Sequence, residues 1–460
     1  MSHSPLATLK RRLAAVALSV CMANPAAAAN HEDLKLPNLG STSTSLFSSQ
    51  YERNLGRAWL GMYRSQVNTL NDPLLYGYLE DLLYKLVTHS DLDDRRIELV
   101  IADNPAMNAF AVPGGVVGVH SGLLLYAQTE GEFASVLAHE IGHLSQRHFS
   151  RRMQQQKANQ PFTLAALLAS LVLMAATNAQ AGMAAISATQ AAAQDAALRY
   201  SRANEIEADR VGMQILAKAG FDPNATAKMF ERMMASTRLY SENRLPEFLR
   251  THPLSETRVA DARLRATRYP PVIQTISLDY QLMRTRVRLH QASSPQQAIK
   301  LFTAELDNKA VLQEAARYGL ALALTKAGQT ERARKELSHI YTPGDQKVAY
   351  ILADAAIDSA EQRPDIAAKK LATALKQSPN NHPLTMAYAE ALLYDGKPDQ
   401  AEQLLLKHSR IRPNAPWLWY LLAEVQGLAG NITGLHQARA EFFILRGNLD
   451  QAEAQLGYAL

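Results

Sequence analysis

The chain contains a single cysteine, Cys21, among its 460 residues. Cys21 lies in an N-terminal stretch that we expect to be removed on export, which leaves the mature chain without cysteine. This excludes disulfide bonds and thiolate ligands from the mature protein. A metal site, if present, has to be built from histidines and carboxylates.

A strong net charge is also missing. The formal charge is +5, and Lys10, Arg11 and Arg12 of the N-terminal stretch account for three of those charges. A mature chain so close to neutral gives no basis for a nucleic-acid-binding surface, so we expect no nucleic-acid partner. Hydrophobic residues make up 47% of the chain and charged residues 20%, which is ordinary for a globular protein long enough for two or three domains.

Residues 1–29 have the three parts of a secretory signal peptide. MSHSPLATLKRR is the positive segment, LAAVALSVCM the apolar core, and ANPAAAAN the small-residue cleavage zone. We predict cleavage near Asn30 and export. The apolar core is too short to span a bilayer, although an uncleaved anchor is an alternative. Val20 immediately before Cys21 fits a lipoprotein signal poorly.

Charge is absent from Ala158 to Gln194, where TLAALLASLVLMAA (163–176) is strongly apolar. This run is shorter than the roughly 18 residues expected of a membrane-spanning helix. Two interpretations of residues 163–193 stay open. The segment forms a buried helical hairpin, or it is a flap in peripheral contact with a membrane or a membrane-protein partner.

Two segments have the pattern of strands. RIELVIAD (96–103) alternates apolar and charged residues, and GGVVGVHSGLLL (114–125) indicates a second strand that runs into a turn. The segment between them, NPAMNAFAVPGG, predicts an irregular edge because Pro113 cannot donate a backbone hydrogen bond.

HEIGH (139–143) lies inside a predicted helix that follows the acidic start EGE. Helical spacing places His139 and His143 one turn apart on one face, where both imidazoles can reach one metal ion. Glu140 lies beside them, in position to hold a water molecule. Two surface histidines on a helix would give the same five letters, so the motif needs a third ligand.

A carboxylate on a later helix can supply that ligand. The metzincin pattern is excluded, because Gln146 and Phe149 occupy the places of its Gly and His, and His148 is out of register. RYSRANEIEADR (199–210) places Glu205 and Asp209 one turn apart. Glu205 can bind the metal while Asp209 accepts the free N–H of a ligand histidine. Glu207 points to another face of that helix, so we expect no metal loss from its replacement.

HExxH with a downstream ExxxD resembles the gluzincin metallopeptidases, the family that includes HtpX and the prenyl-protein-processing endopeptidases. NAF followed by PGG, and THPLSETR (251–258), are also similar to that family over roughly residues 50–265. The resemblance implies one Zn²⁺ per chain, held by His139, His143 and Glu205, with Glu140 as the general base. It also implies a sheet edge that aligns an extended substrate, formed by Asn108, Ala109, Phe110, Ala111 and Val112.

Two interpretations of His252 stay open, and the resemblance implies the first. His252 is a fourth ligand that caps the metal in a latent state, as in exported members of the family, or it is a turn histidine ahead of Pro253. A donor for the oxyanion is also required, and Arg258 and His252 are both candidates.

The C-terminal part repeats with a period of 34 residues, as Ala321, Ala355, Ala389 and Ala423 illustrate. Gly328, Gln362, Gly396 and Gly430 follow the same step. This period is typical of tetratricopeptide repeats, in which paired helices stack into a curved solenoid that binds peptides or proteins. We therefore predict a mainly α protein. Residues 30–265 form an α+β zinc metalloprotease domain with a small β-sheet, and residues 266–460 an all-α repeat solenoid, each with its own core.

The combination of an export signal, a gluzincin domain and these repeats resembles the periplasmic proteases that enhance β-barrel assembly. The resemblance implies a periplasmic enzyme that assists the maturation of outer-membrane β-barrel proteins, degrades stalled ones, and docks through its repeats to the barrel-assembly machinery. Two alternatives remain. One is a general quality-control protease of the cell envelope, and the other is a repeat scaffold or chaperone whose protease is latent.

Overall fold

The computed structural model describes residues 48–157, 202–237, 246–273, 275–308 and 312–460. The predicted signal peptide and the apolar segment 163–193 lie outside these ranges. Among the described residues, no helix combines the length and apolar character needed to cross a membrane.

A three-stranded sheet forms the centre of the N-terminal half. It consists of β1 (Glu98–Ala102), β2 (Ala109–Val112) and β3 (Val116–His120), in the order β1-β3-β2. β3 pairs with β1 in parallel and with β2 antiparallel, so β2 is an edge strand. The predicted edge position is confirmed, and residues 104–108 of the predicted irregular segment form no helix or strand, but residues 109–112 form a regular strand. Pro113 lies just beyond β2, and Gly114 and Gly115 form the turn with φ angles of 87° and 85°.

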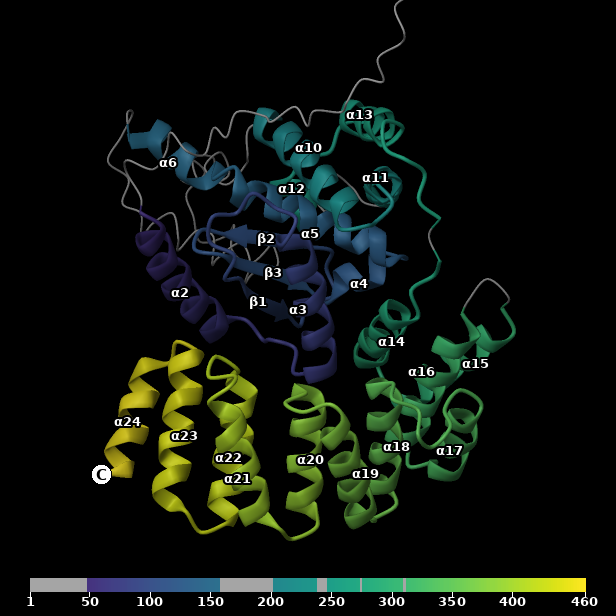
Figure 1. The fold of residues 1–460 in the computed structure, drawn as a ribbon, viewed down its shortest axis with the longest axis vertical. Coiled ribbons are helices and arrows are strands. Elements are labelled where there is room, and N and C mark those ends of the chain that lie inside the picture. Colours follow the sequence, from purple (N-terminus) through teal and green to yellow (C-terminus); the bar gives the residue numbers. More distant parts are fainter. Residues whose placement is uncertain (1–47, 158–201, 238–245, 274, 309–311) are drawn as a thin grey trace, which may run out of the picture.

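Helices cover both faces of this sheet (Figure 1). α2 (Ser49–Gln66) lies on one face, where Trp59 and Tyr63 stack on each other and meet the Phe110 ring edge-on. α3 (Pro73–Val87) and α5 (Glu130–Ser145) contribute to the main core on the other face. The segment after β3, predicted as a turn, is the short helix α4 (Gly122–Tyr126).

The helix that carries HEIGH is α5, and it is capped and buried. The Thr129 side chain accepts a hydrogen bond from the Glu132 N–H, which fixes the start of the helix. α5 packs against α10 (Arg202–Lys218) with unusually close backbones. A Cβ atom on Gly142 would lie 2.9 Å from the Ala208 carbonyl oxygen, and one on Gly212 would lie 2.9 Å from the His139 nitrogen. Glycine at both places lets the two helices approach.

Further helices of the N-terminal half are α11 (Asn224–Thr237), α12 (Glu247–Thr251) and α13 (Glu256–Ala266). Between α5 and α10 the chain also forms α6 (His148–Lys157). The turn from α5 into α6 passes through Arg147, whose φ of 50° lies in the left-handed region that favours glycine.

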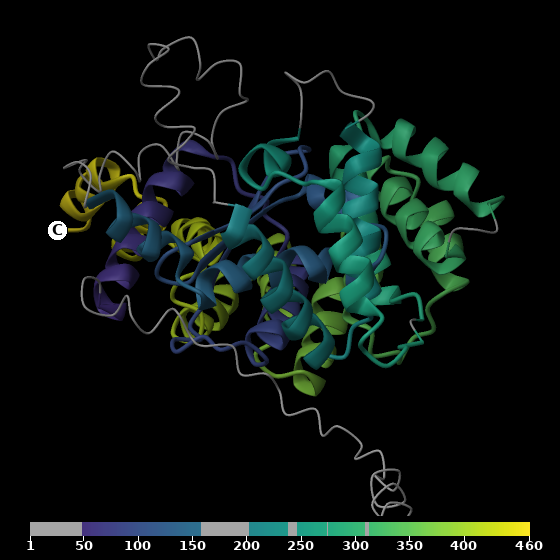
Figure 2. The ribbon, with the colours of Figure 1, turned by 90° about the horizontal axis from the view of Figure 1, so that it is seen from above.

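The C-terminal half is a row of antiparallel helices that curves along one side of the N-terminal half (Figures 1 and 2). Its helices are α14 (Leu278–Gln291), α15 (Pro295–Leu306), α16 (Gln313–Lys326), α17 (Thr330–Ser338), α18 (Val348–Ala360), α19 (Pro364–Gln377), α20 (His382–Tyr394), α21 (Pro398–Ser409), α22 (Pro416–Leu428), α23 (Ile432–Leu445) and α24 (Leu449–Ala459). The 34-residue spacing of Gly328, Gln362, Gly396 and Gly430 reflects a left-handed backbone conformation that recurs at the end of a helix in each repeat. Gly328, Gly396 and Gly430 end helices with φ of 73°, 71° and 77°, and Gln362 adopts 59° at the equivalent place.

The two halves share one core, which corrects the expectation that each has its own. A single apolar cluster runs from Leu75 on α3 through α5 and α14 to Ile357 on α18. Polar contacts also join the halves at more than one place along the solenoid. The Tyr280 hydroxyl donates to the Ala127 carbonyl (2.8 Å), and Arg412 lies 2.7 Å from Glu80. The later repeats have a separate cluster from Ile351 to Ala438.

Candidate metal centre

Two histidines of α5 face each other across one helical turn. The Nε2 atoms of His139 and His143 are 3.0 Å apart, and both side chains are buried. Because both nitrogens point to the same space, the spacing expected of a shared metal ligand pair is present.

Glu205 of α10 completes a triangle with these histidines. Its Oε2 lies 3.5 Å from His139 Nε2, and its Oε1 lies 3.5 Å from His143 Nε2. The close packing of α5 on α10 at Gly142 and Gly212 holds the carboxylate at this distance. Glu207, two residues further, does not belong to this group of ligand atoms.

His252 closes the group from a third segment, at the C-terminal end of α12. Its Nδ1 lies 3.2 Å from both Glu205 oxygens and 3.4 Å from His139 Nε2. The Phe248 ring stacks on the His252 imidazole at 4.8 Å and holds it in place. Ligand atoms of His139, His143, Glu205 and His252 all lie within 4.8 Å of one another.

These separations suit a tetrahedral ion. Four N or O ligands at about 2.1 Å from zinc stand about 3.4 Å apart. The separations of His139 from His143, and of Glu205 and His252 from these ligands as given above, run from 3.0 to 3.5 Å, and the whole group lies within 4.8 Å. The donor set, three imidazoles and one carboxylate, also fits zinc, so the residues present match the ion that the sequence pattern implies.

Asp209 and Arg258 support His139 from behind. Asp209 Oδ1 lies 2.9 Å from His139 Nδ1, the nitrogen that faces away from the cluster. Arg258 grips Asp209 with two hydrogen bonds of 2.7 Å and donates a third to the Pro253 carbonyl. Its guanidinium also lies 3.1 Å from Glu205. Arg258 is thus engaged with carboxylates, and it does not fit the oxyanion role considered for it from the sequence.

The charges of the cluster are strongly coupled. Burial favours neutral His139, but Asp209 and Glu205 outweigh it and raise the pKa of His139 to about 10. Burial lowers the pKa of His143 well below its usual value. For Glu205, burial opposes ionisation, yet the neighbouring His252 and His139 hold its pKa well below the usual range. The metal-free cluster therefore retains a proton, which a bound cation would displace.

Glu140 projects from α5 into the same buried region. Neither of its carboxylate oxygens has a hydrogen-bond partner among the described residues, and His252 Nε2 lies 3.6 Å from Oε1. Burial raises the pKa of Glu140, an effect that His252 and His139 partly oppose. An unpaired carboxylate with a raised pKa beside a metal site is suited to proton transfer.

The predicted substrate edge lies next to α5. Ala109 to Val112 form β2, and Asn108 directly precedes it. The Asn108 carbonyl accepts from the His120 N–H at 3.0 Å, so alternation along the strand turns the backbone groups of Ala109 and Ala111 away from β3. The Phe110 ring lies over Gly118, where a Cβ atom would stand only 2.0 Å from it.

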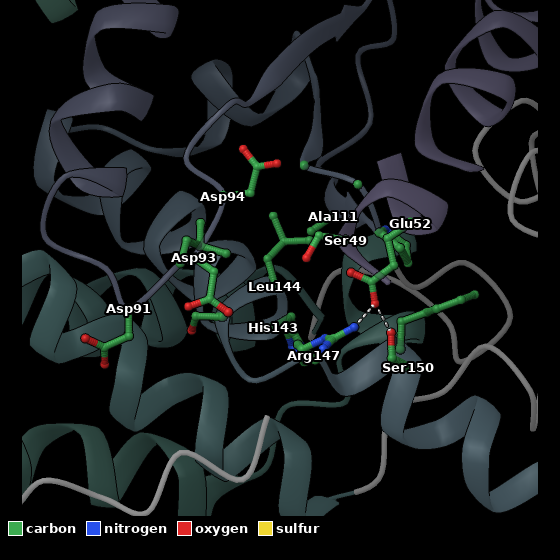
Figure 3. Close-up of a pocket in the computed structure, with 16 residues that line it drawn as sticks. Ser49, Glu52, Asp91, Asp93, Asp94, Ala111, His143, Leu144, Arg147 and Ser150 are labelled. Atoms are coloured by element: carbon green, nitrogen blue, oxygen red, sulfur yellow. Dashed lines mark hydrogen bonds and ion pairs between the residues drawn. The ribbon is translucent and has the colours of Figure 1, made fainter. Parts of the chain in front are cut away.

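A pocket of about 200 Å³ opens beside His143, where β2, the end of α5 and the start of α2 meet (Figure 3). Its wall is rich in carboxylates. Glu52 accepts hydrogen bonds from Arg147 and Ser150, at 2.6 and 2.5 Å, whereas Asp91 and Asp93 lie on the opposite side. Ala111 lines the pocket, which connects it to the substrate edge.

Comparison with known proteins now defines the class. Residues 73–266 match peptidase family M48, and residues 358–425 match a tetratricopeptide repeat. The chain is therefore a metallopeptidase of family M48 that carries repeats, and the predicted fold class is confirmed.

Full-length relatives give the particular family. The chain is 33% identical over 455 residues to the β-barrel assembly-enhancing protease of Escherichia coli K12, covering 98% of this chain and 92% of the relative. It is 37% identical over 439 residues to the putative β-barrel assembly-enhancing protease of Vibrio cholerae, covering 95% and 90%. The mitochondrial metalloendopeptidase OMA1 of Schizosaccharomyces pombe is 30% identical over 203 residues, 43% of this chain and 56% of OMA1. The chain belongs to the family of β-barrel assembly-enhancing proteases.

Proposed function

We propose that the chain is a periplasmic zinc endopeptidase that promotes the assembly of outer-membrane β-barrel proteins and degrades misassembled ones. The relatives named for barrel assembly support this proposal, because they align with nearly the whole chain. The observation that carries the chemistry is the buried group of four ligand atoms within 4.8 Å. Export with removal of residues 1–29 belongs to the same proposal.

In this proposal His139, His143 and Glu205 hold one Zn²⁺, and Asp209 orients His139. When bound, zinc polarises the scissile carbonyl and lowers the pKa of a water molecule. The pair of Asp209 and Arg258 keeps the ring of His139 fixed, because two hydrogen bonds of the guanidinium end on this one carboxylate.

Glu140 is the general base. Its carboxylate accepts a proton from the attacking water and passes it to the leaving amine. Full burial favours this exchange, since the pKa of Glu140 is raised toward the pH at which it works. The outward backbone groups of Ala109 and Ala111 pair with an extended substrate and hold its scissile bond beside Glu140.

Replacing Glu140 with Gln tests the mechanism. Gln is nearly isosteric but accepts no proton, so we expect peptidase activity to fall about 10²- to 10⁴-fold with zinc content unchanged. Glu130→Gln is the matched control on the same helix, because its amide oxygen can still accept from the Tyr78 hydroxyl. Normal turnover by a zinc-loaded Glu140→Gln protein would refute the assigned role.

A latent protease that acts mainly as a scaffold or chaperone is the second candidate, and His252 favours it. Its Nδ1 lies within the ligand group, so it would compete with a nucleophilic water for the fourth ligand position of a bound zinc. We expect His252→Ala to keep zinc and to raise basal proteolysis. A fall in turnover at full zinc occupancy would show that His252 assists the reaction instead.

The solenoid is proposed to recruit partners, with residues 30–265 as the protease domain and 266–460 as the repeat domain. Barrel proteins and their assembly machinery are the proposed partners, and residues 163–193 are a proposed membrane contact. A photo-crosslinking residue at exposed Tyr394 or Tyr420 should capture them in cells, whereas one at exposed Leu264 of α13 should not. Capture of unrelated envelope proteins by the Glu140→Gln variant would favour a general quality-control protease.

A further inference from the structure

The two histidines of α5 are supported differently, and the support of His143 has no role in the mechanism above. His143 Nδ1, the nitrogen that faces away from the cluster, lies 2.8 Å from Nδ1 of His148. His148 is the first residue of α6 and is fully buried. The left-handed turn at Arg147 returns the chain over the end of α5 and places His148 against His143.

A carboxylate stands behind His148. His148 Nε2 lies 3.2 Å from Glu207 Oε2, and Arg151 Nη1 donates to the same oxygen at 3.0 Å. Glu207 belongs to α10, between the cluster residue Glu205 and the supporting residue Asp209. Three acidic residues of α10 are thus linked to the metal centre. Glu205 belongs to the ligand group, Asp209 contacts the outer nitrogen of His139, and Glu207 reaches His143 through His148.

For a neutral His148, the donors and acceptors along this line have one consistent order. An ionised carboxylate accepts only, so His148 Nε2 carries the hydrogen toward Glu207. Neutral His148 then presents Nδ1 as an acceptor, and His143 Nδ1 must donate to it. His143 Nε2 is left with its lone pair, and this is the nitrogen that faces His139 and Glu205.

We propose that His148 and Glu207 are positioning residues that hold His143 in the tautomer and ring orientation required of a metal ligand. This inference rests on the proposed metal site. Glu207 supports His143 as Asp209 supports His139, but the imidazole of His148 lies between Glu207 and His143. Under this proposal Glu207 affects zinc affinity through His148 and His143, although its position on α10 predicted no effect on the metal.

The test measures zinc affinity of the purified full-length apoprotein by competition with a chromogenic chelator. We expect His148→Leu to weaken zinc binding about 10- to 100-fold, as is typical when such a support is lost. His148→Gln should recover part of the loss, because an amide oxygen can accept from His143. Glu207→Leu should weaken binding in the same direction, and the double variant should lose less than the sum of the two effects.

Two controls separate this proposal from other causes. His382→Leu removes a buried histidine hydrogen-bonded to another histidine, His408, at 2.9 Å in the repeats, and it should leave zinc affinity unchanged. Glu205→Ala should abolish tight binding. If Glu205→Ala binds zinc normally, the metal site itself is wrong.

If Glu205→Ala loses zinc while His148→Leu and Glu207→Leu bind it like the wild type, the positioning role is refuted. If His148→Leu fails to fold, Glu207→Leu decides, because Glu207 is partly exposed and its loss leaves the buried imidazole in place.

Discussion

The metal centre and the repeat solenoid are stabilised in different ways. The centre joins α5, α10 and the end of α12, and buried charged groups satisfy one another there, as in the pair of Asp209 and Arg258. The solenoid is built from neighbouring helices, and its ion network around Arg334 is partly exposed. A substitution in the metal centre should therefore destabilise the whole centre strongly, whereas a substitution in the solenoid should destabilise only the neighbouring helices.

The largest difference is expected from removing one arginine in each region. Arg258→Ala leaves the buried carboxylates of Asp209 and Glu205 without their cation, and we expect a loss of about 3–5 kcal/mol of stability. Arg334→Ala should cost about 1 kcal/mol or less, because its side chain is 37% exposed and Lys370 also contacts Asp358. Urea unfolding of both metal-free variants measures the two losses of stability. Equal losses would contradict the expected difference between the metal centre and the solenoid.

A smaller difference is expected from adding one methyl group in each region. In Gly212→Ala the new Cβ meets the backbone of α5, which cannot move without displacing His139. We expect a loss of about 1–3 kcal/mol together with weaker zinc binding. In Gly319→Ala the nearest atoms belong to the side chains of Thr285 and Phe302, which can adjust. Unfolding and zinc competition should show a smaller loss of stability for this variant and normal zinc binding.

The smallest effect is a pH dependence that belongs to the repeats. Burial lowers the pKa of His382 to about 3 and that of His408 to about 4. Because the unfolded chain binds protons near pH 6.5 and the folded chain does not, stability should fall as the pH drops from about 6.5 toward 4. At pH 5.5 His382 alone should contribute about 1 kcal/mol of this loss.

His382→Leu should flatten that acid limb. The measurement is urea unfolding at several pH values, with His290→Leu as the control, since His290 is a more exposed histidine paired with Asp103. An unchanged acid limb in His382→Leu would exclude the buried pair as its cause.

Local patterns in the sequence anticipated much of this architecture. HEIGH predicted two histidines on one face of α5, and their Nε2 atoms are 3.0 Å apart. RYSRANEIEADR drew attention to Glu205 and Asp209, which lie where a third ligand and a histidine support are needed. The predicted irregularity does not extend to β2, because Pro113 falls one residue beyond this strand and leaves its ladder intact.

Other features had no local signal. His148 lies five residues after His143, a spacing that places it off the ligand face of a continuous helix, and only the turn at Arg147 brings it back. Arg258 was one of two candidates for an oxyanion donor, yet its hydrogen bonds end on Asp209 and Pro253.

Elements that depend on periodicity are predictable from the order of residues alone. A turn of helix sets the spacing of His139 and His143, and a left-handed residue at each 34-residue step, such as Gly396, ends the repeat helices. Contacts between elements far apart in the sequence are evident only from the tertiary structure. The approach of α5 to α10, the addition of His252 and the core shared by both halves depend on contacts between distant segments. Such contacts arise from packing of whole surfaces, and no short pattern of residues encodes them.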